Sequence, residues 1–173
     1  MDSRQPSRLR STAAIDGHPL HPLLVAFPIA FLIGALLTDL AFQGTGDAFW
    51  ARASAWLIGS GLVSGALAAV AGFVDFIANE HIRSLSLVWY HFIGNAIALA
   101  LSAVSLYLRL SGDALSVTGT ELLLSILVVV IFAVTGWLGG EMVFRHGVGM
   151  AGERSSVGGR LQPKGSNPNE GRS

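Results

Sequence analysis

Cysteine is entirely absent from this sequence. Disulfide bonds, thiolate metal sites and iron–sulfur clusters ligated by this chain are therefore excluded. A metal ion or a haem would have to be held by histidine, carboxylate or methionine side chains. The main candidates for such a site are the five histidines and the carboxylates that the fold brings near them.

Charged residues are also scarce, at 13% of the sequence against roughly 25% in soluble domains. Hydrophobic residues make up 51% of the chain, which favours a membrane protein. The 11 basic and 11 acidic residues balance, so net charge gives no indication of a nucleic-acid partner. The sequence shows no nucleophilic triad or phosphate-binding loop, and we expect a non-enzymatic protein rather than an enzyme.

Four apolar runs account for most of the chain: residues 23–42, 55–77, 87–108 and 122–144. Each has at least 20 residues, enough for a helix to cross a hydrocarbon core of roughly 30 Å. The connections between the runs are short, which makes consecutive helices antiparallel neighbours. The sequence therefore predicts an all-α integral membrane protein, an up-down-up-down four-helix bundle that residues 17–150 form as one domain in the lipid bilayer.

The two ends of the chain differ from this domain in composition. Residues 1–16 carry three arginines and show no helical periodicity, so we expect a flexible basic N-terminal arm. Residues 151–173 are rich in Gly, Ser, Pro and Arg, which predicts a disordered cytoplasmic tail. The first apolar run exceeds the roughly 7–15 residues of a signal-peptide core and has no A-x-A-like cleavage site after it, so we expect it to be retained.

The positions of the basic residues predict the orientation of the bundle. Nine of the 11 Lys and Arg residues fall on the side of the two termini, whereas Arg52 and Arg109 fall on the other side. Positive charge is enriched in the cytoplasmic segments of membrane proteins. We therefore expect a bacterial inner-membrane protein with its N- and C-termini in the cytoplasm.

The five histidines all belong to the cytoplasmic side in this topology. His18 and His21 precede the first span in the motif GHPLHP, and His81 follows the second span. His91 lies one turn into the third span, and His146 ends the fourth. The predicted topology thus draws histidines from all four helices to one end of the bundle.

Polar side chains within the spans accompany these histidines. A carboxylate inside a span costs roughly 2.5–3.5 kcal/mol at mid-helix, so it is expected to turn inward and find a partner. Asp75 and Asn79 share one helix face, and Asn95 lies one turn beyond a histidine of the third span. With Glu141, these residues predict a hydrogen-bonded polar network at the cytoplasmic leaflet.

Several interpretations of this cluster are open. A b-type haem would take axial ligands from His18, His21, His91 or His146, with Arg145 among the basic residues near its propionates. A transition metal would use the same four histidines with Asp75 and Glu141. A proton or quinone-headgroup site is the third functional interpretation. Alternatively, the chain is a structural or interaction protein whose polar cluster only locks helix packing.

Glycine pairs with a spacing of four residues occur in two of the runs. Gly61 and Gly65 lie in the second run, and Gly136 and Gly140 lie in the fourth. This spacing allows close approach of helix backbones. It is compatible with packing inside one bundle and with a homodimer.

Four segments of the sequence resemble a known family. They are GHPLHPLLVAFPIA at 17–30, GDAFWARA at 46–53, GFVDF at 72–76 and GWLGGEMVFRHGVG at 136–149. Together they are similar to a bacterial four-helix inner-membrane family, domain-of-unknown-function family 2231, over about residues 16–149. Members of that family are sometimes joined to redox proteins such as Rieske-type domains, or found near them. The resemblance therefore implies a four-helix membrane protein and favours haem binding or electron transfer with a redox protein as partner.

Overall fold

The computed structural model describes residues 13–15, 18–112 and 116–146. Its elements are β1 (Ala14–Ile15), β2 (His18–Pro19), α1 (Leu20–Leu24), α2 (Ala26–Thr45), α3 (Ala48–Ala78), α4 (Glu80–Arg83), α5 (Ser86–Ser111) and α6 (Gly119–His146). The expected C-terminal tail and most of the expected N-terminal arm lie outside the described residues.

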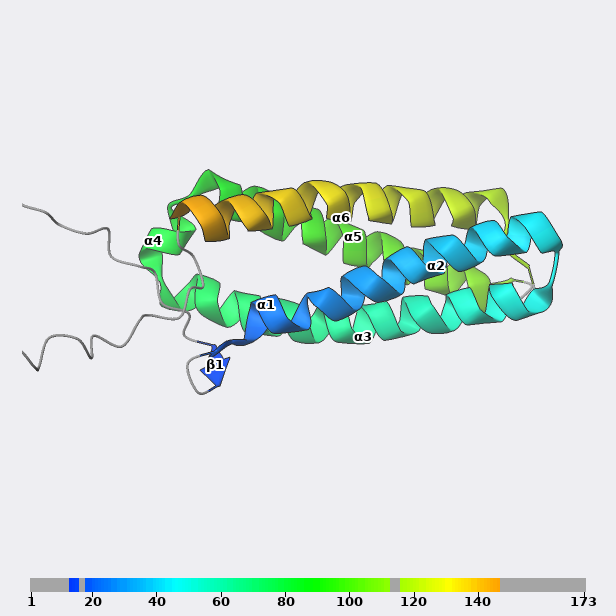
Figure 1. Cartoon of the computed structure of the whole chain (residues 1–173), viewed down its shortest axis with the longest axis horizontal. Coiled ribbons are helices and arrows are strands. Elements are labelled where there is room, and N and C mark those ends of the chain that lie inside the picture. Colours follow the sequence, from blue (N-terminus) through cyan, green and yellow to red (C-terminus); the bar gives the residue numbers. More distant parts are fainter. Residues whose placement is uncertain (1–12, 16–17, 113–115, 147–173) are drawn as a thin grey trace, which may run out of the picture.

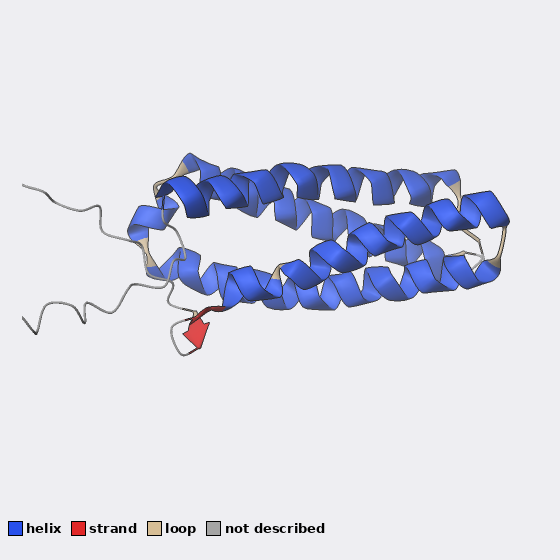
Figure 2. Ribbon diagram, viewed as in Figure 1, coloured by secondary structure: helices blue, strands red, loops and turns tan. Residues whose placement is uncertain are grey.

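Four helical segments are long and apolar enough to span a membrane: Leu20–Thr45, Ala48–Ala78, Ser86–Ser111 and Gly119–Arg145. The predicted all-α, four-span fold is therefore confirmed. Figure 2 shows a bundle of helices with one short strand pair beside it. Figure 1 shows α1, α4 and the C-terminal end of α6 at one end of the bundle, called here the α4 end.

The helices extend beyond the apolar runs because polar residues cap them. α3 begins at Ala48, where Asp47 accepts a hydrogen bond from the backbone N–H of Phe49 at 2.8 Å. α2 ends at Thr45 and is capped by Gly46, whose φ of 68° is left-handed and whose N–H donates to the carbonyl of Phe42 at 2.7 Å. The turn between α2 and α3 thus needs the conformational freedom of glycine at this one position.

The first span is interrupted between α1 and α2 at Val25. Pro28 lies one turn further along and is buried. Proline has no backbone N–H, so the carbonyl of Leu24 lacks its usual helical donor and the helix breaks there. α1, which carries His21, packs against α3.

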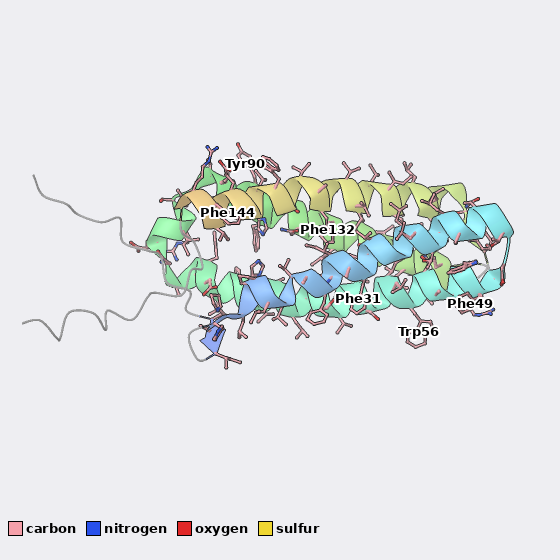
Figure 3. All side chains as sticks on the ribbon, viewed as in Figure 1. Phe31, Phe49, Trp56, Tyr90, Phe132 and Phe144 are labelled. Carbon is pink, nitrogen blue, oxygen red and sulfur yellow. The ribbon has the colours of Figure 1, made fainter. Side chains whose placement is uncertain are left out.

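The helices form a closed ring in which α2 packs against α3 and α6, and α5 packs against α6 and α3. α2 and α5 are therefore diagonal to each other across the interior. The core contains Leu32, Ala35, Ile58, Ala98, Val128 and Phe132. Figure 3 shows Phe132 within the bundle and Trp56 projecting from its outer surface. Large exposed side chains such as Trp56, at 79% exposure, form the outer surface that lipid would contact.

The first glycine pair packs inside the bundle, whereas the second does not. A Cβ added at Gly61 would lie 2.7 Å from Leu32, and one at Gly65 would lie 2.6 Å from Leu99. A Cβ at Gly136 or Gly140 meets no atom within 4 Å. The α3 pair is therefore explained by leucine side chains that pack directly on the two glycines, in keeping with the role of small residues at helix contacts.

Residues 13–15 have a defined place, although they belong to the segment expected to be a flexible arm. Ile15 of β1 pairs with His18 of β2. The backbone N–H of Ala13 donates to a carboxylate oxygen of Asp75, near the end of α3, at 2.8 Å. This bond joins the segment before the first span to the α4 end of the bundle.

Candidate functional site

His21 in α1 is held against α3. Its Nδ1 lies 2.8 Å from the backbone carbonyl oxygen of Ala68. The next turn of α3 carries Gly72, where an added Cβ would lie 2.8 Å from the same Nδ1. The imidazole therefore packs directly on the backbone of α3, because any side chain larger than that of glycine at position 72 would clash with the ring.

His91 in α5 is held against α6 in the same way. Its Nδ1 lies 2.9 Å from the carbonyl oxygen of Thr135. Gly139 follows one turn later, and a Cβ there would lie 3.3 Å from Cε1 of the ring. In both cases the ring bonds a carbonyl and packs on the glycine four residues further along the partner helix.

These contacts set the tautomer of both imidazoles. A carbonyl oxygen only accepts hydrogen bonds, so each Nδ1 carries the proton and donates it. In the neutral rings, each Nε2 then keeps its lone pair free for a ligand. The ring centroids of His21 and His91 are 6.1 Å apart, and the planes are inclined at 79°. The two histidines thus lie next to each other, with nearly perpendicular ring planes, between the two halves of the bundle.

A side-chain bridge supports His91. Asn95 donates to the carbonyl oxygen of His91 at 2.8 Å. The hydroxyl of Thr135 donates to Oδ1 of Asn95 at 3.1 Å. Thr135 therefore contacts both His91 and Asn95, and it fixes the position of the α5 turn relative to α6.

The other predicted site residues that the structure describes lie toward the α4 end. His18 is exposed on β2. Glu141 forms an ion pair with Arg145 one turn later, at 2.8 Å, and the side chain of Arg145 is 74% exposed. Oδ1 of Asn79 accepts a hydrogen bond from the backbone N–H of Ile82 at 3.4 Å. His146 ends α6, and its side chain lies outside the described part of the structure.

The four residues of the predicted polar network make the following contacts. Asp75 binds the backbone of Ala13, Asn79 caps α4, Asn95 bridges α5 to α6, and Glu141 pairs within α6. Among the side chains that the structure describes, no group of three or more histidines and carboxylates is arranged to hold a metal ion.

A second polar site lies toward the opposite end of the bundle. Arg109 of α5 binds both carboxylate oxygens of Asp39 of α2, at 3.0 and 2.8 Å. The side chains are 2% and 0% exposed, respectively. Ser125 of α6 donates to the same carboxylate at 2.6 Å. A cavity of about 10 Å³, about the size needed for one water molecule, is lined by Ser102, Ser105, Ser125 and four apolar residues.

The sequence analysis did not predict this buried pair, because the third apolar run was expected to end at residue 108, one residue before Arg109. One feature of the sequence could have predicted the pair: the two charged residues lie at equal distances along the chain from His21 and His91. Asp39 lies 18 residues after His21, and Arg109 lies 18 residues after His91. Because the two histidines start antiparallel hairpins from the same end, equal spacing brings the two charges to the same level.

The fold and these sites define a four-span helical membrane protein with two polar sites in its interior, one toward each end. The chain belongs to the family described as Predicted membrane protein (DUF2231), whose model matches residues 17–152. No curated protein and no solved structure matches the chain significantly.

Proposed function

We propose that the chain is a membrane redox subunit in which His21 and His91 are the axial ligands of one b-type haem. The facing pair of imidazoles carries this proposal. Two rings that ligate one ion from opposite sides, with bonds of about 2 Å, have centroids about 6 Å apart. The observed separation is 6.1 Å.

The number of ligands favours haem over a bare metal ion. Structural zinc sites use four protein ligands and catalytic zinc sites use three. The described side chains offer two oriented histidines and no larger group. A haem brings its own four nitrogen ligands and needs only two axial residues, which matches this pair.

The surroundings of the pair suit this role. Gly72 and Gly139 leave room for the rings, and each Nδ1–H is fixed by a carbonyl, so Nε2 is oriented as in metal-ligating histidines. Arg145 lies six residues beyond Gly139, or about 9 Å along α6, within reach of a propionate. A bound haem supplies reversible one-electron transfer, and a redox protein docking at the α4 end would be the partner.

The proposal also includes the orientation of the bundle in the membrane, which the positions of the arginine and lysine residues support. We place the protein in a bacterial inner membrane with the α4 end and both termini in the cytoplasm, because nine of 11 basic residues belong to that side. A reporter fused after Gly149 should be active as a cytoplasmic fusion. Activity only in the periplasm would contradict the orientation and would leave the haem proposal unaffected.

The haem proposal is tested by the absorption spectrum of the full-length protein, purified from cells supplied with a haem precursor. We expect a Soret band that disappears in His91→Gln and in His21→Gln. Glutamine can still donate a hydrogen bond to the helix carbonyl, so these variants are expected to keep the fold. His18→Gln is the matched control and should keep the band.

A colourless wild-type protein would contradict the proposal, as would a Soret band that survives both substitutions. The alternative interpretation would then stand, in which the two histidines only connect helices through their hydrogen bonds. In that case the glutamine variants should unfold at nearly the same temperature as the wild type.

A further inference from the structure

A groove runs along the lipid-facing side of the contact between α3 and α5, in the half of the bundle away from α4. Its volume is about 360 Å³. It is lined by Arg52, Ala55, Trp56, Gly59, Leu106 and Leu110. The same two helices meet through stacked aromatic rings nearer the α4 end, such as Phe76 and Phe92 at 5.8 Å. The groove is therefore the open half of one helix contact.

The groove changes in polarity along its length. Arg52 lies four residues after the start of α3 at Ala48, so it is at the membrane boundary. Gly59 lies seven residues further along α3, or about 10 Å deeper in the bundle. The groove thus has a cationic outer end and an apolar inner part, aligned with the helices.

The charge of Arg52 is available to a ligand. Its side chain is exposed, and among the described residues it has no carboxylate partner. This contrasts with Arg109, which Asp39 neutralises. An unpaired guanidinium at this level binds phosphate groups well.

We propose that this groove binds one anionic phospholipid, with its phosphate at Arg52 and one acyl chain along Ala55, Gly59 and Leu106. The polarity of the groove matches a headgroup followed by a tail. The alternative occupant, a helix of a second copy, is distinguished by the oligomeric state in the test below. The acyl chain gains packing in the notch at Gly59, where an added Cβ has its nearest neighbour at 4.0 Å.

The test compares phosphatidylglycerol with phosphatidylcholine of the same acyl chains, by native mass spectrometry of the full-length protein in detergent. One arginine near a membrane surface contributes about 1 kcal/mol toward anionic lipid, so we expect about fivefold stronger retention of phosphatidylglycerol. Arg52→Gln should remove this preference and leave phosphatidylcholine retention unchanged.

A second variant tests the apolar part of the groove. Gly59→Leu should fill the groove and lower retention of both lipids. Gly136→Leu is the matched control, because it adds the same side chain at an α6 position where a Cβ meets nothing within 4 Å. Equal retention of the two lipids by the wild type, or an unchanged preference in Arg52→Gln, would overturn the proposal. A wild-type dimer that both groove variants convert to a monomer would overturn it too, in favour of a second copy.

Discussion

The buried pair of Asp39 and Arg109 allows a test of whether the two residues stabilise the bundle as a charge pair or only by filling space. The perturbation is a set of three variants: Asp39→Leu, Arg109→Met, and the two together. The single variants each leave one charged group buried and without its partner. The double variant removes both charges and keeps apolar side chains of similar length in the interior.

The expected magnitudes follow from the burial and the geometry of the pair. The side chains are 0% and 2% exposed and share two hydrogen bonds. Removing one partner of such a pair costs about 3–5 kcal/mol, whereas replacing both by apolar groups is neutral or stabilising by about 1–4 kcal/mol. In Arg109→Met, Ser125 still donates to the carboxylate, and in Asp39→Leu, Ser105 and Ser125 still accept from the guanidinium, so each single variant keeps a neutral partner for the remaining charge. The double variant should be more stable than either single variant.

The assay is equilibrium unfolding in detergent micelles, followed by far-ultraviolet circular dichroism on the full-length protein. High salt should change the wild-type stability little, because buried pairs are weakly screened. The reasoning is refuted if the double variant loses as much free energy of unfolding as the two single variants combined. That result would show that the residues stabilise the bundle independently and that their charges are not coupled.

Three other predictions test smaller features. Gly94→Ala should lower the free energy of unfolding by about 1–3 kcal/mol, because its Cβ would lie 2.5 Å from a β-branched threonine of α6; in the same thermal melts Gly136→Ala should cost nothing, and equal losses would contradict the packing. Gly72→Ala should displace the ring of His21, which we expect to measure as weaker haem retention at unchanged helix content. Full haem retention would show that the position of His21 does not depend on a glycine at position 72. Glu141→Gln removes a half-exposed ion pair and should cost at most about 1 kcal/mol at low salt, with the cost shrinking at high salt.

Span number and fold class were predictable because membrane crossing needs length and apolar composition, and both are written in the sequence. Helix ends were predictable only to within one or two turns, since α3 begins at Ala48, seven residues before the expected start at 55. α5 continues to Ser111, three residues past the expected end at 108, and this extension places Arg109 on a buried helix face. Arg109, one residue past the expected end of the helix, is thereby part of the buried interior.

The candidate site was predictable in its residue types and only partly in its membership. His21 and His91 were both named, but so was His18, which lies on an exposed strand. Spacing alone does not show which way a residue faces when two prolines interrupt the helical pattern. Similarly, the two glycine pairs have equal spacing, yet only the one in α3 contacts neighbouring side chains.

The equal spacing of the two polar sites has a consequence for how the halves of the chain recognise each other. In each half, the first span carries a histidine and, 18 residues later, a charge. The helices that carry the two charges, α2 and α5, are diagonal in the ring. Around a two-fold axis along the bundle, each residue would face its own counterpart. Two histidines can lie side by side in such a symmetric pair. Two copies of Asp39, however, would bury two like charges next to each other. Arg109 at the corresponding position therefore breaks the symmetry: it favours the pairing of two different hairpins and disfavours the pairing of either hairpin with a copy of itself.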